Sequence, residues 1–332
     1  MATSWAKRAH TYKAWKGLVH KQSCLFTEKT NKPDAFSTWG GLRLRRFESD
    51  EISYNATISS CGKDVQWNDA VALFLDARLR RVRPNVITYN ATISACARGA
   101  RWHEALSILS GMRPHRLEPN VITYTAAISA CAKGSGRPEA LVLFSDMRPG
   151  LVEPNVITYN AIISVCAKGA KWHEALVMLL DMRPRRLEPD VITYGAAISA
   201  CAKGEVWQEA MVLFSNMRAR RLDPDVITYN ANINACEKGA GWQEALNLFS
   251  DMRPRRLQIN VITYNTTICA CGKGARWQEA LGMFSDMRRQ LEPDVITYNA
   301  TISAFESGTK WQEALGMLSD MRPSRLAPDV IT

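Results

Sequence analysis

The sequence predicts an all-α solenoid built from stacked helix-turn-helix hairpins. Two observations predict this fold. A block that begins Val-Ile-Thr-Tyr recurs every 35 residues along most of the chain, with a single spacing of 34. Within each block, apolar residues fall into two stretches with helical spacing. Because a unit of this size cannot bury a core alone, neighbouring units must stack on one another.

The repeated part of the chain is one elongated array. The five residues Val-Ile-Thr-Tyr-Asn stand complete at Val86, Val156, Val226, Val261 and Val295, and the first copy reads Glu51-Ile52-Ser53-Tyr54-Asn55. Eight repeats follow, at 51–85, 86–120, 121–155, 156–190, 191–225, 226–260, 261–294 and 295–329. Residues 330–332 begin a truncated ninth repeat. The first residue of each repeat is called position 1 below.

Residues 1–50 do not follow the period. No acidic residue occurs up to Thr27, while lysines and Arg8 are spread among apolar residues. This composition is typical of an organelle transit peptide, so we expect a chloroplast or mitochondrial location. A disordered tail or a degenerate repeat, with a cytoplasmic location, is the alternative interpretation.

The first helix of each repeat carries its apolar stripe at positions 4, 8 and 11, as Tyr89, Ile93 and Cys96 show in repeat two. A Pro-Asp or Pro-Asn pair precedes it, and the Asp or Asn is expected to be its N-cap. The glycine that follows the helix is expected to be a left-handed stop. These glycines are Gly99, Gly134, Gly169, Gly204, Gly239 and Gly274.

The second helix has an apolar face at positions 17, 20, 21, 24 and 27. In repeat two these are Trp102, Ala105, Leu106, Leu109 and Met112. An Arg-Pro pair often follows, and we expect it to close the helix because proline cannot continue one.

Composition excludes several classes of protein. The chain is 46% hydrophobic, as globular proteins are, and contains no apolar run near the ~18 residues of a membrane span. Seven of its nine cysteines recur at position 11, which indicates small buried side chains in a reducing compartment rather than disulfides. The lone Cys269-x-Cys271 pair and the His103-Glu104 and His173-Glu174 pairs lack the further ligands of a zinc site. We therefore expect no enzyme, no metal and no cofactor.

A second face of the first helix is left for binding. In repeat four it presents Ile157, Asn160, Ser164, Ala167 and Lys168. An amide beside an aliphatic side chain, with a cation nearby, suits a nucleotide base and its phosphate. A mildly polar face with solvated cations is the alternative.

The run Val-Ile-Thr-Tyr-Asn, then Lys-Gly, Glu-Ala-Leu, Leu-Phe-Ser-Asp-Met and Pro-Asp, resembles the pentatricopeptide repeat family over residues 51–332. The resemblance implies a right-handed α-solenoid that binds single-stranded RNA, one base per repeat. It implies that positions 5 and 35 select the base and that position 2 sandwiches it.

The site residues implied by the resemblance can be given by number. The base-selecting pairs are Asn55/Asn85, Asn90/Asn120, Thr125/Asn155, Asn160/Asp190, Gly195/Asp225, Asn230/Asn260, Asn265/Asp294 and Asn299/Asp329. The sandwiching residues are Ile52, Ile87, Ile122, Ile157, Ile192, Ile227, Ile262 and Ile296. The phosphate-contacting cations at position 13 are Lys63, Arg98, Lys133, Lys168, Lys203, Lys238 and Lys273. The implied RNA site is 5′-YYAU(G)YUU-3′, with the fifth base weakly selected because Gly195 has no side chain.

The resemblance further implies a role in processing, stabilising or editing organelle transcripts, through a monomer that recruits an RNA-processing enzyme and does not contact membranes. A protein-interaction scaffold like the tetratricopeptide arrays, or a decayed and inactive copy, remains open at this point. Repeat seven is one residue short near Arg288-Arg289-Gln290, which is expected to disturb the register of repeat eight.

Overall fold

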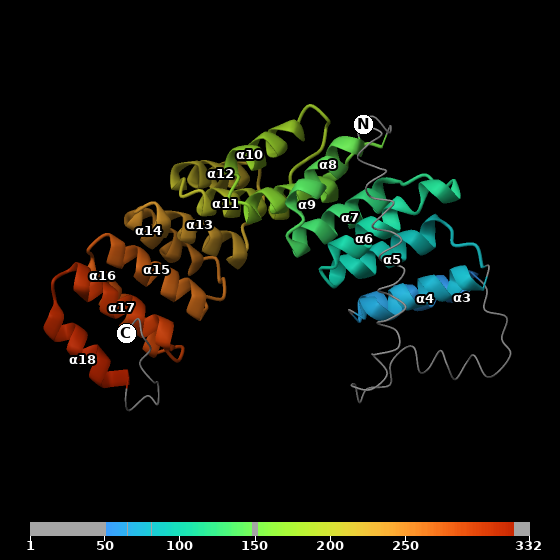
Figure 1. Cartoon of the computed structure of the whole chain (residues 1–332). Coiled ribbons are helices and arrows are strands. Elements are labelled where there is room, and N and C mark those ends of the chain that lie inside the picture. The colour runs from blue at the N-terminus through green and yellow to red at the C-terminus, as the bar shows by residue number, and fades with distance from the viewer. Residues whose placement is uncertain (1–50, 65, 81, 148–151, 322–332) are drawn as a thin grey trace. The chain divides into compact units, whose positions relative to one another are not determined.

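The structure is a computed structural model, and it describes residues 51–64, 66–80, 82–147 and 152–321. The leader at 1–50 and the start of repeat nine lie outside these ranges. The chain divides into two compact units, Met1–Val152 and Glu153–Thr332, each described by itself. The described residues form α-helices and one short 3-10 helix, without strands (Figure 1).

Each repeat supplies one helix pair. The first unit contains α3 (Glu51–Lys63), α4 (Trp67–Leu79), α5 (Val86–Arg98), α6 (Trp102–Ser110), η1 (Arg113–His115), α7 (Val121–Gly134) and α8 (Arg137–Met147). The second unit contains α9 (Val156–Lys168), α10 (Trp172–Asp181), α11 (Val191–Lys203), α12 (Trp207–Ala219), α13 (Val226–Lys238), α14 (Trp242–Met252), α15 (Val261–Lys273), α16 (Trp277–Arg288), α17 (Val295–Ser307) and α18 (Trp311–Met321).

Within each unit the helices form two layers. Each first helix packs against the first helix of the next repeat, as α9 does against α11 and α11 against α13. It also packs against the second helix of its own repeat and of the preceding one. This arrangement confirms the all-α solenoid.

The predicted core positions are buried. Tyr89, Ile93 and Cys96 are at most 1% exposed, and all seven position-11 cysteines are buried and form no disulfide. Burial, reinforced by the charge of Glu104, raises the pKa of the Cys96 thiol to about 12. These thiols are therefore inert packing groups, as expected.

The predicted N-caps are confirmed. In every described repeat boundary the Asp or Asn at position 35 accepts a hydrogen bond from the backbone N–H of the threonine at position 3. At most of these ends the threonine hydroxyl returns the interaction by accepting from the cap residue's own N–H, as Thr193 does from Asp190 at 3.1 Å. The residue at position 35 is thus the N-cap of the next helix, in addition to any other role.

The expected left-handed glycine is wrong. Gly99, Gly169, Gly204, Gly239 and Gly274 have φ between −80° and −90°, and Gly134 is the last residue of α7. The left-handed residue comes one position later and is not glycine: Ala100, Ser135, Ala170, Glu205, Ala240 and Ala275 have φ between 53° and 68°.

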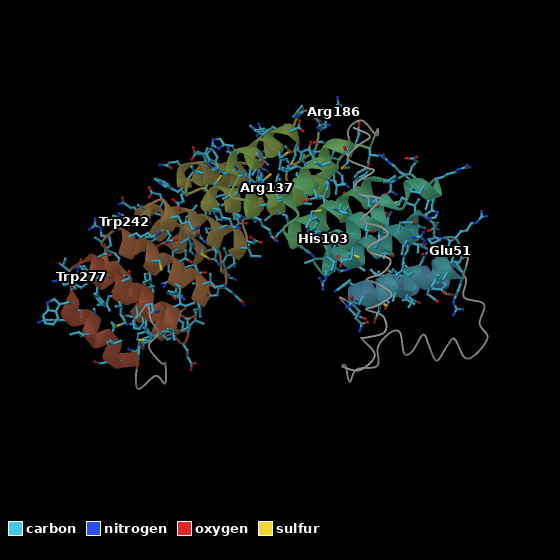
Figure 2. The ribbon with its side chains drawn as sticks, in the orientation of Figure 1. Glu51, His103, Arg137, Arg186, Trp242 and Trp277 are labelled. Atoms are coloured by element: carbon cyan, nitrogen blue, oxygen red, sulfur yellow. The ribbon has the colours of Figure 1, made fainter. Side chains whose placement is uncertain are left out.

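The glycine is required by a tryptophan instead. A Cβ on Gly99 would lie 2.4 Å from Cδ1 of Trp67, the position-17 residue of the preceding repeat. The same close approach joins Gly274 to Trp242 and Gly308 to Trp277, both tryptophans labelled in Figure 2. Each tryptophan therefore packs over the end of the next repeat's first helix, and only glycine leaves room for it.

Proline sets the length of the second helix, as expected. Helices α6, α10 and α14 precede an Arg-Pro pair and end at Ser110, Asp181 and Met252. Helix α12 has Ala219 in place of that proline and continues through it.

The missing residue of repeat seven is absorbed in its turn. In repeats two, four, five and six the turn contains a left-handed arginine, such as Arg256, and the N–H of Leu257 reaches back five residues to the carbonyl of Met252. In repeat seven the N–H of Leu291 bonds the carbonyl of Met287, four residues back, at 2.8 Å. The turn loses its left-handed residue, and Asp294 still caps α17.

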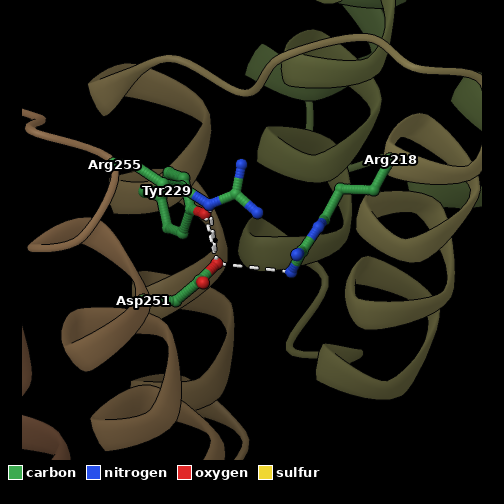
Figure 3. A network of polar contacts seen from close by, with 4 residues as sticks. All are labelled: Arg218, Tyr229, Asp251 and Arg255. Carbon is green, nitrogen blue, oxygen red and sulfur yellow. Dashed lines mark hydrogen bonds and ion pairs between the residues drawn. The ribbon is translucent and has the colours of Figure 1, made fainter.

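A polar cluster around Asp251 of α14 joins repeats five and six (Figure 3). Asp251 accepts from the Tyr229 hydroxyl at 2.5 Å, from Arg255 at 3.1 Å and from Arg218 of the preceding repeat at 3.3 Å. Burial alone would raise the pKa of Asp251, but these donors together hold it below its usual value. The cluster belongs to the scaffold.

Candidate functional site

A row of isoleucines marks one edge of each unit. The position-2 residues Ile87, Ile157 and Ile227 are 64%, 64% and 74% exposed in the first turns of their helices. Ile52, Ile122, Ile192, Ile262 and Ile296 share this exposure. Folding gains nothing from a β-branched apolar side chain in water, so the row is a surface available for a partner.

The residues at positions 5 and 35 of a repeat meet beside this row. In repeat four, Nδ2 of Asn160 donates to Oδ1 of Asp190 at 3.1 Å, although 30 residues separate them. In repeat seven, Asn265 donates to Asp294 at 3.1 Å. In repeat two, Asn90 donates to Asn120 at 3.3 Å. The structure therefore pairs the side chains that sequence analysis selected.

The asparagines lie at a junction between helices rather than on an open face. Asn160 and Asn265 are only 9% and 8% exposed. Their Oδ1 atoms face the threonine of the next first helix, Thr193 and Thr297, at 2.5 Å and 2.7 Å. Position 5 thus has a structural role in packing neighbouring first helices together.

Repeat one departs from this pattern. Position 1 holds Glu51, labelled in Figure 2, instead of valine. Asn85 donates its amide to that carboxylate. Oδ1 of Asn55 is buried and finds no hydrogen-bond partner within the described residues. The side chains at positions 5 and 35 of repeat one therefore present a different set of donors and acceptors.

The four other pairs need separate mention. Gly195 has no side chain to offer Asp225, whose Oδ1 accepts instead from the Thr228 hydroxyl at 2.7 Å. Asn230 accepts from Thr263 at 2.7 Å, beside the cap residue Asn260. Thr125 and Asn155 belong to the two separate units, and Asp329, the partner predicted for Asn299, lies outside the described residues.

The carboxylates of Asp190 and Asp294 have lowered pKa values. Burial alone would raise the pKa of Asp190, but hydrogen bonds from Thr193 and Asn160 together lower it below its usual value. The same balance, with Thr297 and Asn265 as donors, lowers the pKa of Asp294. Both groups are therefore hydrogen-bond acceptors at neutral pH.

Position 12 does not lie on the exposed face, contrary to expectation. Ala97, Ala167 and Ala202 are 6%, 6% and 4% exposed. The glycine at this position in repeat seven shows why, since a Cβ on Gly272 would lie 3.2 Å from Ala304 of the next first helix. Position 12 packs neighbouring first helices together.

The position-13 cations do project into solvent. Lys63, Arg98, Lys133, Lys168, Lys203, Lys238 and Lys273 are all exposed. Lys273 also forms an ion pair with Glu237 of the preceding repeat, with Nζ and Oε1 2.6 Å apart. The row supplies positive charge at the opposite end of the first helices from the isoleucines.

Within the described ranges, no group of three His, Cys, Asp or Glu side chains is placed to hold a metal ion. None of the helices described is long and apolar enough to cross a bilayer. Sequence reasoning missed the threonine contacts and the tryptophan–glycine packing. Both could have been found as residues that recur together in adjacent repeats.

Family models match the chain from residue 52 to 322 without a gap. The PPR repeat family matches 154–203 and 259–306, and the pentatricopeptide repeat domain matches 72–134, 107–169 and 212–274. The PPR repeat matches 52–82, 192–222 and 296–322. The chain belongs to the pentatricopeptide repeat family. No curated protein matches it in sequence.

Solved structures share the pentatricopeptide fold. The crystal structure of the maize pentatricopeptide repeat protein PPR10 has a TM-score of 0.60 and 22% identity, covering 89% of this chain and 47% of that one. PPR10 in complex with an 18-nucleotide psaJ RNA element has a TM-score of 0.56 and 22% identity, covering 90% and 49%. The present chain spans about half the length of these structures.

Proposed function

We propose that this protein binds single-stranded RNA along the edge formed by positions 2, 5 and 35, with one base to each repeat. The observation that carries the proposal is the recurrence of an exposed isoleucine beside a paired Asn and Asp or Asn. An aliphatic surface takes the face of a base, and the paired side chains take its edge. PPR10, which shares the fold, has been crystallised with RNA.

The helix cap explains how position 35 distinguishes the pyrimidines. Oδ1 of the residue at position 35 is committed to the threonine N–H, at 2.8 Å for Asp190 and 3.1 Å for Asn120. The remaining atom is therefore an acceptor, Oδ2, in an aspartate and a donor, Nδ2, in an asparagine. Uracil presents N3–H, which needs an acceptor, whereas N3 of cytosine needs a donor.

The asparagine at position 5 supplies the second contact. Since its Oδ1 is turned to the threonine, its Nδ2 is left to donate, as Asn160 does to Asp190. Nδ2 carries two hydrogens, so one remains for a carbonyl oxygen of a pyrimidine. Repeats four and seven accordingly select U, repeat two selects C, and the proposed site is 5′-YYAU(G)YUU-3′.

The exposed position-13 row completes the proposal. A chain of phosphates requires cations at regular intervals, and one Lys or Arg per repeat provides them from repeat one to repeat seven. Affinity should therefore fall as salt rises, while base preference persists.

The test is a titration of purified protein with 5′-CCAUGCUU-3′ and with a shuffled oligomer of the same composition. We expect the matched oligomer to bind at least about tenfold more tightly, because several base contacts are lost together. Equal affinity at moderate salt would overturn base selection. Protein partners that persist after nuclease treatment, with no RNA bound, would favour the scaffold interpretation.

The proposed setting is an organelle, where the bound RNA is masked, remodelled or presented to a recruited enzyme. The support is the acid-poor basic leader, which lies outside the described residues. Fusion of residues 1–50 to a fluorescent protein tests this setting. Import into chloroplasts or mitochondria is expected, and a diffuse cytoplasmic signal would contradict it.

A further inference from the structure

A buried threonine lies behind each base-selecting pair. The position-3 residues Thr123, Thr193, Thr263 and Thr297 are all 0% exposed. Their hydroxyl oxygens lie 2.6, 2.5, 2.7 and 2.7 Å from Oδ1 of the asparagine at position 5 in the preceding repeat. The threonine thus contacts the position-5 asparagine, although the threonine itself is buried.

Hydrogen counting shows which contact the hydroxyl makes as a donor. A threonine hydroxyl has one hydrogen, and in Thr193 both Asn160 Oδ1 at 2.5 Å and Asp190 Oδ1 at 2.8 Å compete for it. The asparagine is the nearer acceptor here, and likewise for Thr123, at 2.6 against 3.0 Å. The Thr193 hydroxyl also accepts from the Asp190 N–H at 3.1 Å, so one of its two lone pairs is occupied as well.

We infer that the position-3 threonine is a positioning residue that fixes the amide of the preceding position-5 asparagine with Nδ2 toward the base. This inference rests on the proposed function of positions 5 and 35. A reversed amide would place Asn160 Oδ1 against Oδ1 of Asp190, an unfavourable approach of two acceptors, and would leave the Thr193 hydrogen without its nearer acceptor. Selection of a pyrimidine over adenine, which has no carbonyl oxygen to accept from Nδ2, then depends on a hydroxyl that touches no base.

Two repeats of the same chain show that capping and positioning are separate roles. Thr228 follows Gly195, so its hydroxyl bonds Asp225, the N-cap of α13, at 2.7 Å and has no amide to orient. Thr88 reaches only Asn85, at 3.2 Å, and leaves Asn55 Oδ1 without a partner. Thr228 is therefore a natural control, because its replacement by valine removes a hydroxyl contact to an N-cap residue and no contact to an amide.

The experiment measures the ratio of affinities for 5′-CCAUGCUU-3′ and the same oligomer with A at the fourth nucleotide. Wild type, Thr193→Val, Thr193→Ser and Thr228→Val are titrated, and their melting is followed by circular dichroism. We expect Thr193→Val to lower the U-over-A ratio about tenfold, since one oriented hydrogen bond is lost. Thr193→Ser keeps the hydroxyl and should keep the wild-type ratio.

The Thr228→Val control should distinguish a loss of base preference from a loss of stability. Thr228→Val should melt earlier but leave the ratio at the fourth nucleotide unchanged. Thr297→Val, read at the seventh nucleotide, repeats the test in another repeat should Thr193→Val fail to fold. An unchanged ratio in a folded Thr→Val variant would overturn the positioning role while leaving the proposed function intact. A wild-type protein with no U preference would overturn the proposed function itself.

Discussion

Repeats four and five share their buried tyrosine and capping aspartate but differ at position 5. Tyr159 and Tyr194 are 0% and 3% exposed at the same position, and Asp190 and Asp225 cap the helices that follow. At position 5, however, repeat four has the nearly buried Asn160, and repeat five has Gly195. One side chain therefore separates a site with an oriented amide from a site without one.

The comparison teaches that the residue at position 5 can change without repacking the core. A Cβ on Gly195 would meet only Thr228 Oγ1, at 3.4 Å, within ordinary contact distance. Thr228 and Asp225 already stand where Thr193 and Asp190 stand in the preceding site. Repeat five therefore has the threonine and the aspartate of the site but lacks the asparagine amide.

The largest expected effect comes from the packing that both repeats share. Gly204→Ala places a Cβ 2.2 Å from Cδ1 of Trp172, which joins repeat five to repeat four. Overpacking of this kind should lower the free energy of unfolding by about 1–3 kcal/mol. Urea denaturation measures it, with Gly282→Ala as control, since nothing lies within 4 Å of a Cβ there. A loss of stability in Gly282→Ala but none in Gly204→Ala would refute the tryptophan–glycine packing.

A smaller effect of opposite sign is expected at the next residue. Glu205 has φ of 60°, a conformation that costs an L-residue about 1 kcal/mol and glycine almost nothing. Glu205→Gly should therefore raise the urea midpoint, and Glu205→Ala, which keeps the left-handed strain, should not. Equal midpoints for both variants would mean that the turn is not strained.

The smallest effect is the pH dependence that Asp190 adds in repeat four. Its folded pKa lies below the ordinary value of 3.8, so its ionisation stabilises the fold above that pH. The stability gap between wild type and Asp190→Asn should stay constant from about pH 7 to 5 and narrow as pH falls below the ordinary pKa. Urea midpoints measure the gap. Narrowing already between about pH 7 and 5 would contradict the lowered pKa.

Much of the scaffold could be predicted from the repeat itself. The period, the apolar spacing of Tyr89, Ile93 and Cys96, and the capping Asp or Asn each have a local cause, and each was confirmed. The shortened turn of repeat seven was expected to disturb the register of repeat eight. In the structure the turn lacks a left-handed residue instead, and no helix is shifted.

The candidate site could be predicted only in part, because its chemistry is shared between repeats. The sequence identifies Asn160 and Asp190 but not their contact, nor the threonine 33 residues away that orients the amide. The glycine after each first helix was misread for the same reason. Its partner, a tryptophan such as Trp172, belongs to the preceding repeat.

The central claim, that one amide at position 5 decides whether a repeat selects a base, is tested most directly by exchanging repeats four and five. The double variant Asn160→Gly and Gly195→Asn is titrated with oligomers carrying each base at the fourth and fifth nucleotides. The preference for U should move from the fourth nucleotide to the fifth, with a change of about tenfold or more at each. A preference that stays at the fourth nucleotide, in a variant that folds, would contradict the account.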